Sequence, residues 1–183
     1  EKTSFSFSVS ISNVTTNDKN TVISSSLSTL PVIINKAAYC NLKSGIPSNS
    51  QLISNRAGWI INVEEGVEGA PNNLIDGKTG TDVALNNKGF WFTVDLGEAK
   101  VLTGIKTNHW ANAYAPREVE ILQSENGTTW KSLSSLAIPP GGTQNITFIS
   151  PITTRYLKYQ IITISTNGRT DVTEFNVYEP KSE

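Results

Sequence analysis

The stretch "TNHWANAYAP" at residues 107–116 combines aromatic side chains with histidine and asparagine. His109, Trp110 and Tyr114 stand there without the alternation of apolar and polar residues that is typical of a buried strand. The apolar face of a sugar ring packs on an aromatic ring, while polar side chains hydrogen-bond the hydroxyl groups. The stretch therefore predicts a carbohydrate site. The alternative is a surface loop whose aromatic rings fold back onto the protein.

The stretch "NNLIDGKTGT" at residues 72–81 surrounds one carboxylate, that of Asp76, with glycines and threonines. Calcium in proteins takes about six to eight oxygen ligands from carboxylates, hydroxyl groups and backbone carbonyls. Glycines allow a short loop to turn its carbonyl groups inward, so these residue types together suit a hard cation. The alternative is a type I turn that the Asp76 carboxylate caps.

Residues for catalysis are poorly placed in the sequence. Cys40 and His109 could form a nucleophile and its base, but Cys40 stands in "KAAYCNL" with no neighbour to orient the pair. Glycoside hydrolysis needs two carboxylates that face each other across a cleft. The candidate acids belong instead to a strand-to-turn segment or a loop, where a solvated role is favoured: Asp95, Glu98, Glu64, Glu65 and Glu68. Nucleophile-elbow, P-loop and dinucleotide-binding motifs are absent, so we predict that the protein is not an enzyme.

The composition restricts the partners. A net charge of −1, with lysines and arginines scattered singly, offers no basic stripe for nucleic acid and no polybasic patch for anionic lipid. The single Cys40 and the single histidine exclude an internal disulfide and thiolate-rich or histidine-rich metal centres. No apolar run approaches the length of about 20 residues that spans a bilayer, so we expect no membrane insertion. Serine, threonine and asparagine dominate the polar residues, which is typical of secreted and cell-surface β-proteins.

Short β-segments separated by turn residues must position these loops. They follow one another without a helical period: "GWIINVEE", "GFWFTVDLG", "KVLTGIKTNHW", "REVEILQSE", "TWKSLSSL", "QNITFISP", "TRYLKYQIITIS" and "TEFNVYEP". The stretch "SENGTTW" predicts a hairpin, because Asn126-Gly127 readily supplies the positive φ angles of a tight turn. The pattern predicts an all-β protein with an antiparallel β-sandwich or jelly roll.

The N-terminal residues form a separate β-segment. At residues 4–12, "SFSFSVSIS" alternates apolar residues with serine, as a half-buried strand does. A segment of about 40 residues is too short for an independent core, so it docks on the rest of the chain or on an upstream domain. The stretch "NLKSGIPSNSQ" at residues 41–51 is typical of a connector. We therefore predict an N-terminal β appendage at residues 1–45, which can be the end of an upstream β-domain, and the main domain at residues 46–183.

From about Leu52 to Tyr178 the chain resembles the discoidin family, also called the coagulation factor 5/8 type C (F5/8 type C) domain. The bacterial relatives of that family form carbohydrate-binding module family 32. The family's landmarks appear in order: "AGWIINVEEG", "NNLIDGKTGT", "GFWFTVDLGEAKVLTGIKT", "VEILQSENGTTWKSL", "RYLKYQIIT" and "TEFNVYE". The resemblance implies a discoidin-like jelly roll with a galactose-binding-domain-like fold. It does not cover residues 1–45.

The resemblance also implies that the Asp-Gly loop wraps a structural calcium ion. Carried over position by position, the ligands are the side chains of Asp76, Thr81 and Glu174 and the carbonyl groups of Asn73, Lys78, Thr81 and Thr173. Such an ion ties an early loop to the final strand. If the turn alternative holds instead, Glu174 is a solvated side chain.

The sugar sites of the family lie on end loops that include residues 107–116. We predict a shallow groove, to which Arg56 or Asn87 contributes from neighbouring loops, and whose main residues are Asn108, His109, Trp110, Asn112 and Tyr114. Galactose-binding members carry a Trp-His pair after the Asp-Gly loop and an Arg followed by Asn after the next strand pair. Here Val83-Ala84 and Asn108-His109 stand at these places, so a different glycan, or no glycan, is expected.

The remaining tryptophans are predicted to pack. Trp91 and Trp130 match family positions that fill the core. Trp59 opens the first strand of the domain and is expected in the core or at its rim. Trp110 is left as the platform for a ligand.

These features predict a noncatalytic carbohydrate-binding module that is part of a larger extracellular or cell-surface protein. Such modules serve glycan-degrading enzymes or glycan-capture lipoproteins, including lipoproteins anchored in a bacterial outer membrane. The alternative is a protein-interaction or adhesion module that uses the same end loops.

Overall fold

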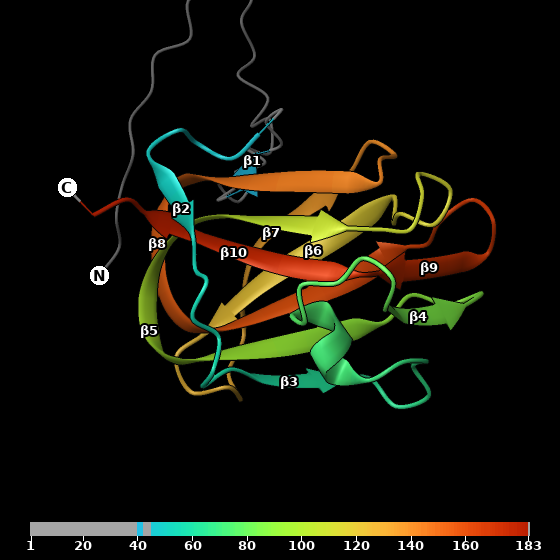
Figure 1. Ribbon diagram of the computed structural model, residues 1–183, viewed down its shortest axis with the longest axis horizontal. Coiled ribbons are helices and arrows are strands. Elements are labelled where there is room, and N and C mark those ends of the chain that lie inside the picture. The colour runs from blue at the N-terminus through green and yellow to red at the C-terminus, as the bar shows by residue number, and fades with distance from the viewer. Residues whose placement is uncertain (1–39, 42–44, 183) are drawn as a thin grey trace, which may run out of the picture. The chain divides into compact units, whose positions relative to one another are not determined.

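The computed structural model describes residues 40–41, by their backbone, and residues 45–182. The strand predicted at residues 4–12, with the rest of the N-terminal appendage before Cys40, lies outside the described residues. The described part is almost entirely β-structure (Figure 1): β1 (Cys40–Asn41), β2 (Ser50–Leu52), β3 (Ile60–Val63), the 3₁₀ turn η1 (Pro71–Leu74), β4 (Val83–Asn86), β5 (Trp91–Asn108), β6 (Glu118–Ser124), β7 (Lys131–Ala137), β8 (Thr143–Thr163), β9 (Arg169–Val172) and β10 (Glu174–Pro180). No helix in this part of the chain is long and apolar enough to cross a membrane.

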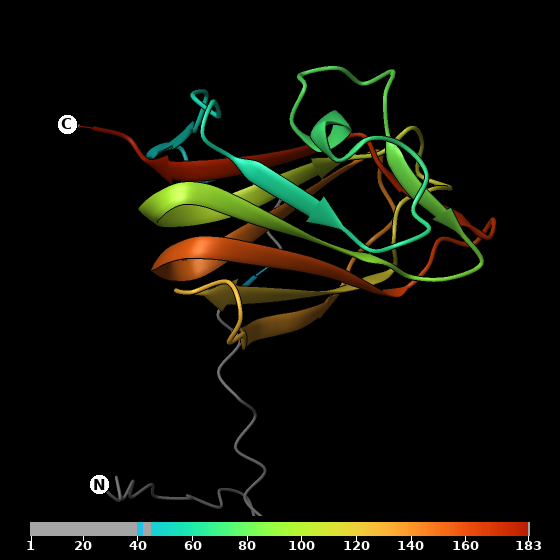
Figure 2. The same cartoon turned by 90° about the horizontal axis from the view of Figure 1, so that it is seen from below.

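Two long strands, β5 and β8, pass from one layer of the fold into the other. Residues 92–95 of β5 pair with β3, and residues 91–95 pair with residues 156–160 of β8. After a register shift, residues 100–108 of β5 pair with residues 143–154 of β8, and residues 104–108 also pair with β10. Both strands curve strongly at the same end in Figures 1 and 2.

The other strands extend these layers, and every pairing is antiparallel. β6 and β7 continue the first layer beyond β8, and β2 continues the second layer beyond β10. β4 and β9 form a separate two-stranded sheet. The predicted all-β antiparallel sandwich is therefore confirmed.

Two pairs of segments that were predicted as separate strands form single continuous strands in the structure. The predicted strands around "GFWFTVDLG" and "KVLTGIKTNHW" are two halves of β5, and those around "QNITFISP" and "TRYLKYQIITIS" are two halves of β8. Gly97 bends β5 without ending it: its φ is 81°, and its N–H donates to Asp95 Oδ1 at 2.8 Å. Arg155 of β8 donates to both oxygens of the same carboxylate, at 2.8 and 2.9 Å. The bends of the two strands are therefore fixed to each other, and the hydrogen bond from Arg155 holds the pKa of Asp95 below its ordinary value.

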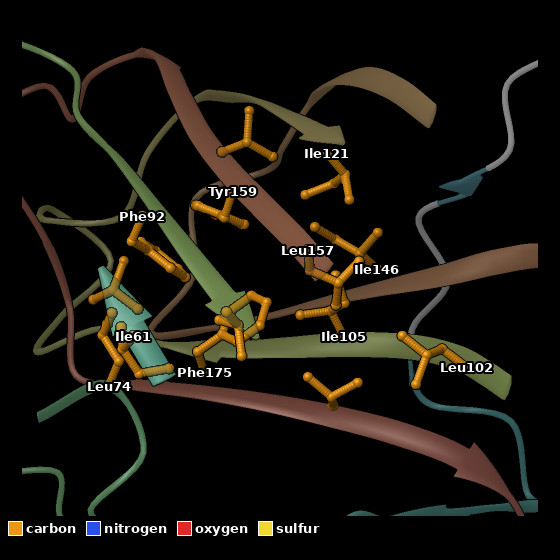
Figure 3. Close-up of a cluster of buried hydrophobic side chains, with 14 of the residues drawn as sticks. Ile61, Leu74, Phe92, Leu102, Ile105, Ile121, Ile146, Leu157, Tyr159 and Phe175 are labelled. Carbon is orange, nitrogen blue, oxygen red and sulfur yellow. The ribbon is translucent and has the colours of Figure 1, made fainter. Parts of the chain in front are cut away.

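Aromatic rings from both layers meet in the core (Figure 3). Phe92 on β5 stacks on Tyr159 of β8 with 5.1 Å between ring centroids, and Phe175 on β10 meets Phe92 edge-on at 5.0 Å. All three side chains are buried. Burying one large apolar side chain contributes roughly 1.5–3 kcal/mol, so these rings supply a substantial part of the attraction between the layers.

The tryptophans divide differently from the prediction. Trp59 is buried in the core, as expected. The core prediction for Trp91 and Trp130 is wrong, because both are only half-buried. Side chains alternate along a strand, so Trp91 faces outward beside the inward-facing Phe92. There Lys158 Nζ lies 4.7 Å from the centroid of the Trp91 ring.

The domain begins earlier in the chain than a boundary at residue 46 implies. β1 pairs with Thr147 and Phe148 of β8, and β2 pairs with residues 178–180 of β10. Part of the stretch that resembles a connector, residues 41–51, therefore belongs to the sheet. Its turn-rich composition does not prevent edge pairing, because an edge strand needs only its backbone groups on one side.

Candidate functional site

A hollow lies beside the loop that follows β5. It has a volume of about 260 Å³ and is lined by Asp82, Trp110, Tyr114, Arg169 and Asp171. We call it the Trp110 hollow. Trp110 is 60% exposed, and Tyr114 is half-buried. The structure thus brings together the two aromatic residues that the sequence predicts for one site.

The small sheet of β4 and β9 positions the polar residues of the Trp110 hollow. Asp171 of β9 is opposite Ala84 of β4, and Arg169 lies two residues before Asp171, on the same face of the strand. Asp171 also anchors the loop. Its backbone N–H donates to the Tyr114 carbonyl at 3.3 Å, and its Oδ1 accepts the backbone N–H of Trp110 at 3.2 Å.

Arg169 is surrounded by carboxylates. Its Nη1 lies 2.9 Å from Asp82 Oδ2 and 3.6 Å from Asp171 Oδ2, and its Nη2 lies 3.3 Å from Glu68 Oε2. Burial alone would lower the pKa of Arg169, but the hydrogen bond and charge of Asp82, with the charges of Glu68 and Asp171, raise it. Arg169 therefore remains a cation within an acidic environment.

His109 does not line the Trp110 hollow, so the prediction that it contacts a sugar is wrong. Its side chain is fully buried. Nδ1 lies 2.6 Å from the carbonyl oxygen of Asp171 and must donate to it, because a carbonyl only accepts. Nε2 then accepts from the Thr107 hydroxyl at 3.0 Å. The regular alternation at the end of β5 explains the error: it turns residue 109 inward and residue 110 outward.

The three predicted asparagines do not line the Trp110 hollow. Asn108 Nδ2 donates to the Thr143 hydroxyl at 3.0 Å, which joins the end of β5 to the start of β8. Asn112 Oδ1 accepts the backbone N–H of Gly142 at 2.6 Å, which joins the Trp110 loop to the loop before β8. Asn87 is exposed after β4, with a φ of 57°.

Arg56 does not line the Trp110 hollow, contrary to its predicted place beside Trp110. It lines a separate hollow of about 470 Å³, together with Asp76, Glu174 and Asn176. Its Nη2 donates to Asn176 Oδ1 at 2.6 Å, and its Nη1 lies 3.3 Å from Glu174 Oε2. Its Nε donates to the Ile53 carbonyl at 3.3 Å, and its guanidinium lies 5.7 Å from the centroid of the Trp59 ring. We call Ile53, Arg56, Trp59, Glu174 and Asn176 the Arg56 cluster. These contacts fix the guanidinium of Arg56 against β10 and the chain before β3.

The Asp-Gly loop folds around its carboxylate and against Glu174. Asp76 Oδ1 accepts the backbone N–H of Lys78, and Asp76 Oδ2 accepts the Thr81 hydroxyl, each at 2.8 Å. Gly77 donates its backbone N–H to Glu174 Oε1. The carboxylate cap of the turn alternative is thus present, but the solvated Glu174 of that alternative is wrong, because Glu174 is 5% exposed.

The electrostatics of Glu174 leave its charge incompletely offset. Burial raises the pKa of Glu174, and the charge of Asp76 raises it further. The Gly77 N–H and the Arg56 guanidinium act in the opposite direction without cancelling the shift. The carboxylates of Asp76 and Glu174 therefore meet at this loop, and Arg56 contacts only Glu174 of the two.

The oxygen atoms of this loop fit a hard cation. Thr81 Oγ1 lies 2.8 Å from Asp76 Oδ2 and 3.5 Å from the Lys78 carbonyl oxygen. Such spacings suit neighbouring ligands of one calcium ion with bonds of about 2.3–2.6 Å. Within residues 45–182, no three His, Cys, Asp or Glu side chains converge on a common point, so hydroxyl and carbonyl oxygens must complete the set.

The two remaining predicted ligand positions connect this loop to its surroundings. The Asn73 side-chain amide donates to the Asp82 carbonyl at 2.8 Å, which links the Asp-Gly loop to the Trp110 hollow. The Thr173 backbone N–H donates to the Asn108 carbonyl at 2.8 Å, which links the start of β10 to the end of β5.

The sequence gives no prediction for the charged residues that line the Trp110 hollow, which are Asp82, Arg169 and Asp171, or for Glu68, which pairs with Arg169. One local signal is present in "NGRTDV" at residues 167–172: a turn pair is followed by an arginine and an aspartate two residues apart, which share a strand face. Their acidic partners come from residues 68 and 82, and no spacing along the chain indicates that encounter.

Comparison with known families identifies the domain. The family model described as the F5/8 type C domain matches residues 54–175, which is more than half of the chain. The chain belongs to the F5/8 type C domain family. No match was found among curated proteins.

Solved structures with the same fold support this F5/8 type C assignment. The family 32 carbohydrate-binding module of Clostridium perfringens NanJ, in complex with galactose, is 22% identical with a TM-score of 0.60, and covers 71% of this chain and 99% of its own. An F5/8 type C domain of a Bacteroides fragilis protein is 19% identical with a TM-score of 0.62, and covers 74% and 100%. Truncated AlyQ, with family 32 and alginate lyase domains, is 21% identical with a TM-score of 0.58, and covers 68% and 32%. At these identities the likeness shows the fold.

Proposed function

We propose that this F5/8 type C domain is a noncatalytic carbohydrate-binding module whose binding site is the Trp110 hollow. The observation that carries this proposal is an indole ring, 60% exposed, beside a hollow lined by an arginine and two carboxylates. An exposed aromatic ring provides apolar area for one face of a sugar, and charged polar groups orient its hydroxyls. The family 32 module of NanJ, which shares this fold, is in complex with galactose.

The affinity of one such site is expected to be weak. A sugar stacked on one indole buries little apolar area, and each hydroxyl exchanges a hydrogen bond to water for one to protein. A dissociation constant in the millimolar to micromolar range, about −4 to −8 kcal/mol, follows. Attachment to a larger protein with further binding sites raises the overall affinity by multivalency.

We also propose a structural calcium ion in the Asp-Gly loop. The side chains of Asp76, Thr81 and Glu174 would hold it, with the carbonyl groups of Asn73, Lys78, Thr81 and Thr173. Its chemistry there is charge neutralisation and cross-linking, because it offsets two carboxylates and ties the loop to β10. The incompletely offset charge of Glu174 supports this proposal.

The wider setting that we propose is an extracellular or cell-surface protein with further domains. AlyQ combines a module of this fold with an alginate lyase domain. A glycan-degrading enzyme or a glycan-capture lipoprotein of a bacterial outer membrane is a setting in which a weak sugar-binding domain is useful.

A glycan array tests the proposed function. The wild-type chain is compared with Trp110→Ala and with Trp91→Ala, a matched loss of a half-buried indole on the outer face of β5. We expect array signals that Trp110→Ala abolishes and Trp91→Ala retains, with both variants folded by circular dichroism. A silent array together with capture of a protein partner favours the adhesion alternative. Binding that survives Trp110→Ala contradicts the proposed site.

A further inference from the structure

Asp171 offers the Trp110 hollow a buried acceptor that has no donor. Its side chain has no exposed surface, although it lines the hollow. Oδ1 accepts the N–H of Trp110, whereas Oδ2 accepts no hydrogen bond, and the nearest Arg169 nitrogen is 3.6 Å away. An unpaired buried acceptor is costly, so a ligand hydroxyl that donates to Asp171 Oδ2 gains more than an exposed hydrogen bond would.

Negative charge exceeds positive charge around Asp171 Oδ2. Arg169 is the cation that lines the Trp110 hollow, and it already contacts Asp82 at 2.9 Å and Glu68 at 3.3 Å. With Asp171, three carboxylates surround one guanidinium. A ligand anion that approached Arg169 would have to displace these contacts and would lie close to the remaining carboxylates.

We propose that the Trp110 hollow selects uncharged sugars and excludes sugars that carry a carboxylate or sulfate group. This inference rests on the carbohydrate-binding function proposed above. A hydroxyl group donates to a carboxylate in a charge-assisted hydrogen bond, whereas an ionised carboxylate or sulfate only accepts. Asp171 and Asp82 therefore favour a ring whose hydroxyl groups point at them while its apolar face lies on Trp110.

The test compares matched neutral and anionic polysaccharides: galactan with polygalacturonate, mannan with polymannuronate, and dextran with dextran sulfate. Dissociation constants for the 183-residue chain are measured by titration calorimetry at physiological and at high salt. In each pair that binds, we expect the neutral member to bind at least about tenfold more tightly at physiological salt. The preference should shrink at high salt, because added ions screen the repulsion.

Two charge variants test whether the carboxylates around Arg169 cause the selectivity. Asp82→Asn removes one carboxylate, keeps the side-chain size and frees a contact of Arg169, so the preference for the neutral member should fall at least about threefold. Glu98→Gln removes the same charge at the distant bend of β5 and should leave the preference unchanged. If Asp82→Asn keeps the full preference for the neutral polysaccharide, the carboxylates around Arg169 do not cause the selectivity.

The outcomes separate this inference from the proposed function. If an anionic member binds as tightly as its neutral partner and Trp110→Ala abolishes both, the Trp110 hollow binds carbohydrate but the selectivity is wrong. If no polysaccharide of either kind binds, and the glycan array is also silent, both proposals are wrong.

Discussion

The Arg56 cluster and the Trp110 hollow use the same residue types in different surroundings. Each pairs an arginine with a carboxylate from the last part of the chain: Arg56 with Glu174, and Arg169 with Asp171. The Arg56 side chain is 13% exposed and donates to Asn176 and to backbone carbonyls of the protein. The Arg169 side chain is 30% exposed and lines a hollow beside an exposed indole.

The difference shows that the partners of a loop arginine decide its role. Arg56 also lines a hollow, of about 470 Å³, but its nitrogen atoms donate to acceptors from several parts of the chain, so it holds the fold together. Arg169 shares a hollow with an acceptor that has no donor, so the same chemistry is available to a ligand. Substitutions that remove one partner at a time test this distinction.

The largest effect is expected from Arg56→Ala. The substitution leaves the carboxylate of Glu174 buried without its cation, and breaking a buried ion pair in this way costs about 3 kcal/mol. Urea denaturation in calcium-free buffer should show a lower free energy of unfolding with an unchanged slope. Lys100→Ala, which removes one partner of the exposed pair with Glu98, is the control and should have little effect. A similar free energy of unfolding for wild type and Arg56→Ala would contradict the structural role.

Calcium should stabilise the region of the Arg56 cluster. An ion that binds only the folded state adds about 2.7 kcal/mol at a hundredfold excess over its Kd, which raises Tm by about 5–10 °C for a domain of this size. Differential scanning calorimetry with calcium or with EGTA measures the shift. In Glu174→Gln the shift should be lost. Equal wild-type Tm values in both buffers would show that the calcium proposal is wrong.

His109→Ala should weaken both stability and sugar binding. It removes two buried hydrogen bonds beneath the Trp110 loop and leaves the Asp171 carbonyl and the Thr107 hydroxyl without them, at a cost of about 2 kcal/mol. Urea denaturation and glycan titration measure the two losses on one sample. Asn112→Ala, which removes an exposed contact of the same loop, should cost less. If a destabilised His109→Ala chain keeps its full affinity for sugar, the buried His109 ring is not needed to position the Trp110 hollow.

The smallest expected effect is a pH dependence from Glu174. The pKa of Glu174 is raised in the folded state, so the folded chain holds this proton more tightly than the unfolded chain. In calcium-free buffer, stability from this group should fall as the pH rises from the ordinary 4.5 through the raised value. Glu174→Gln should lack this contribution.

Asp95 separates that effect from general acid denaturation. The pKa of Asp95 is lowered in the folded state. Its contribution to stability is therefore complete above the ordinary pKa of 3.8 and is lost as the pH falls through the lowered pKa. The two windows therefore lie on opposite sides of about pH 4. A Tm that rises between pH 4.5 and 7 equally in wild type and Glu174→Gln would contradict the assignment to Glu174.

Features that depend on neighbours along the chain could be predicted from the sequence. Short β-segments between turn residues, without a helical period, predicted β3, β6, β7, β10 and the halves of β5 and β8. The lack of apolar periodicity around Trp110 predicted an exposed indole. The residue types around Asp76, with the family resemblance, predicted that the Asp-Gly loop and Glu174 come together, and the Gly77 contact joins them.

The pairing of distant charged residues depends on how the strands pack, and the sequence does not predict it. β4 and β9 are short, and their pairing places Arg169 beside Asp82, 87 residues earlier, and Glu68, 101 residues earlier. Coulomb attraction acts through space and leaves no period in the sequence, so any of several carboxylates was an equal candidate. The same reason applies to Arg56 and His109. Their residue types suit a sugar site, but the packing of Glu174 and of the Asp171 carbonyl against them decided that they stabilise the fold.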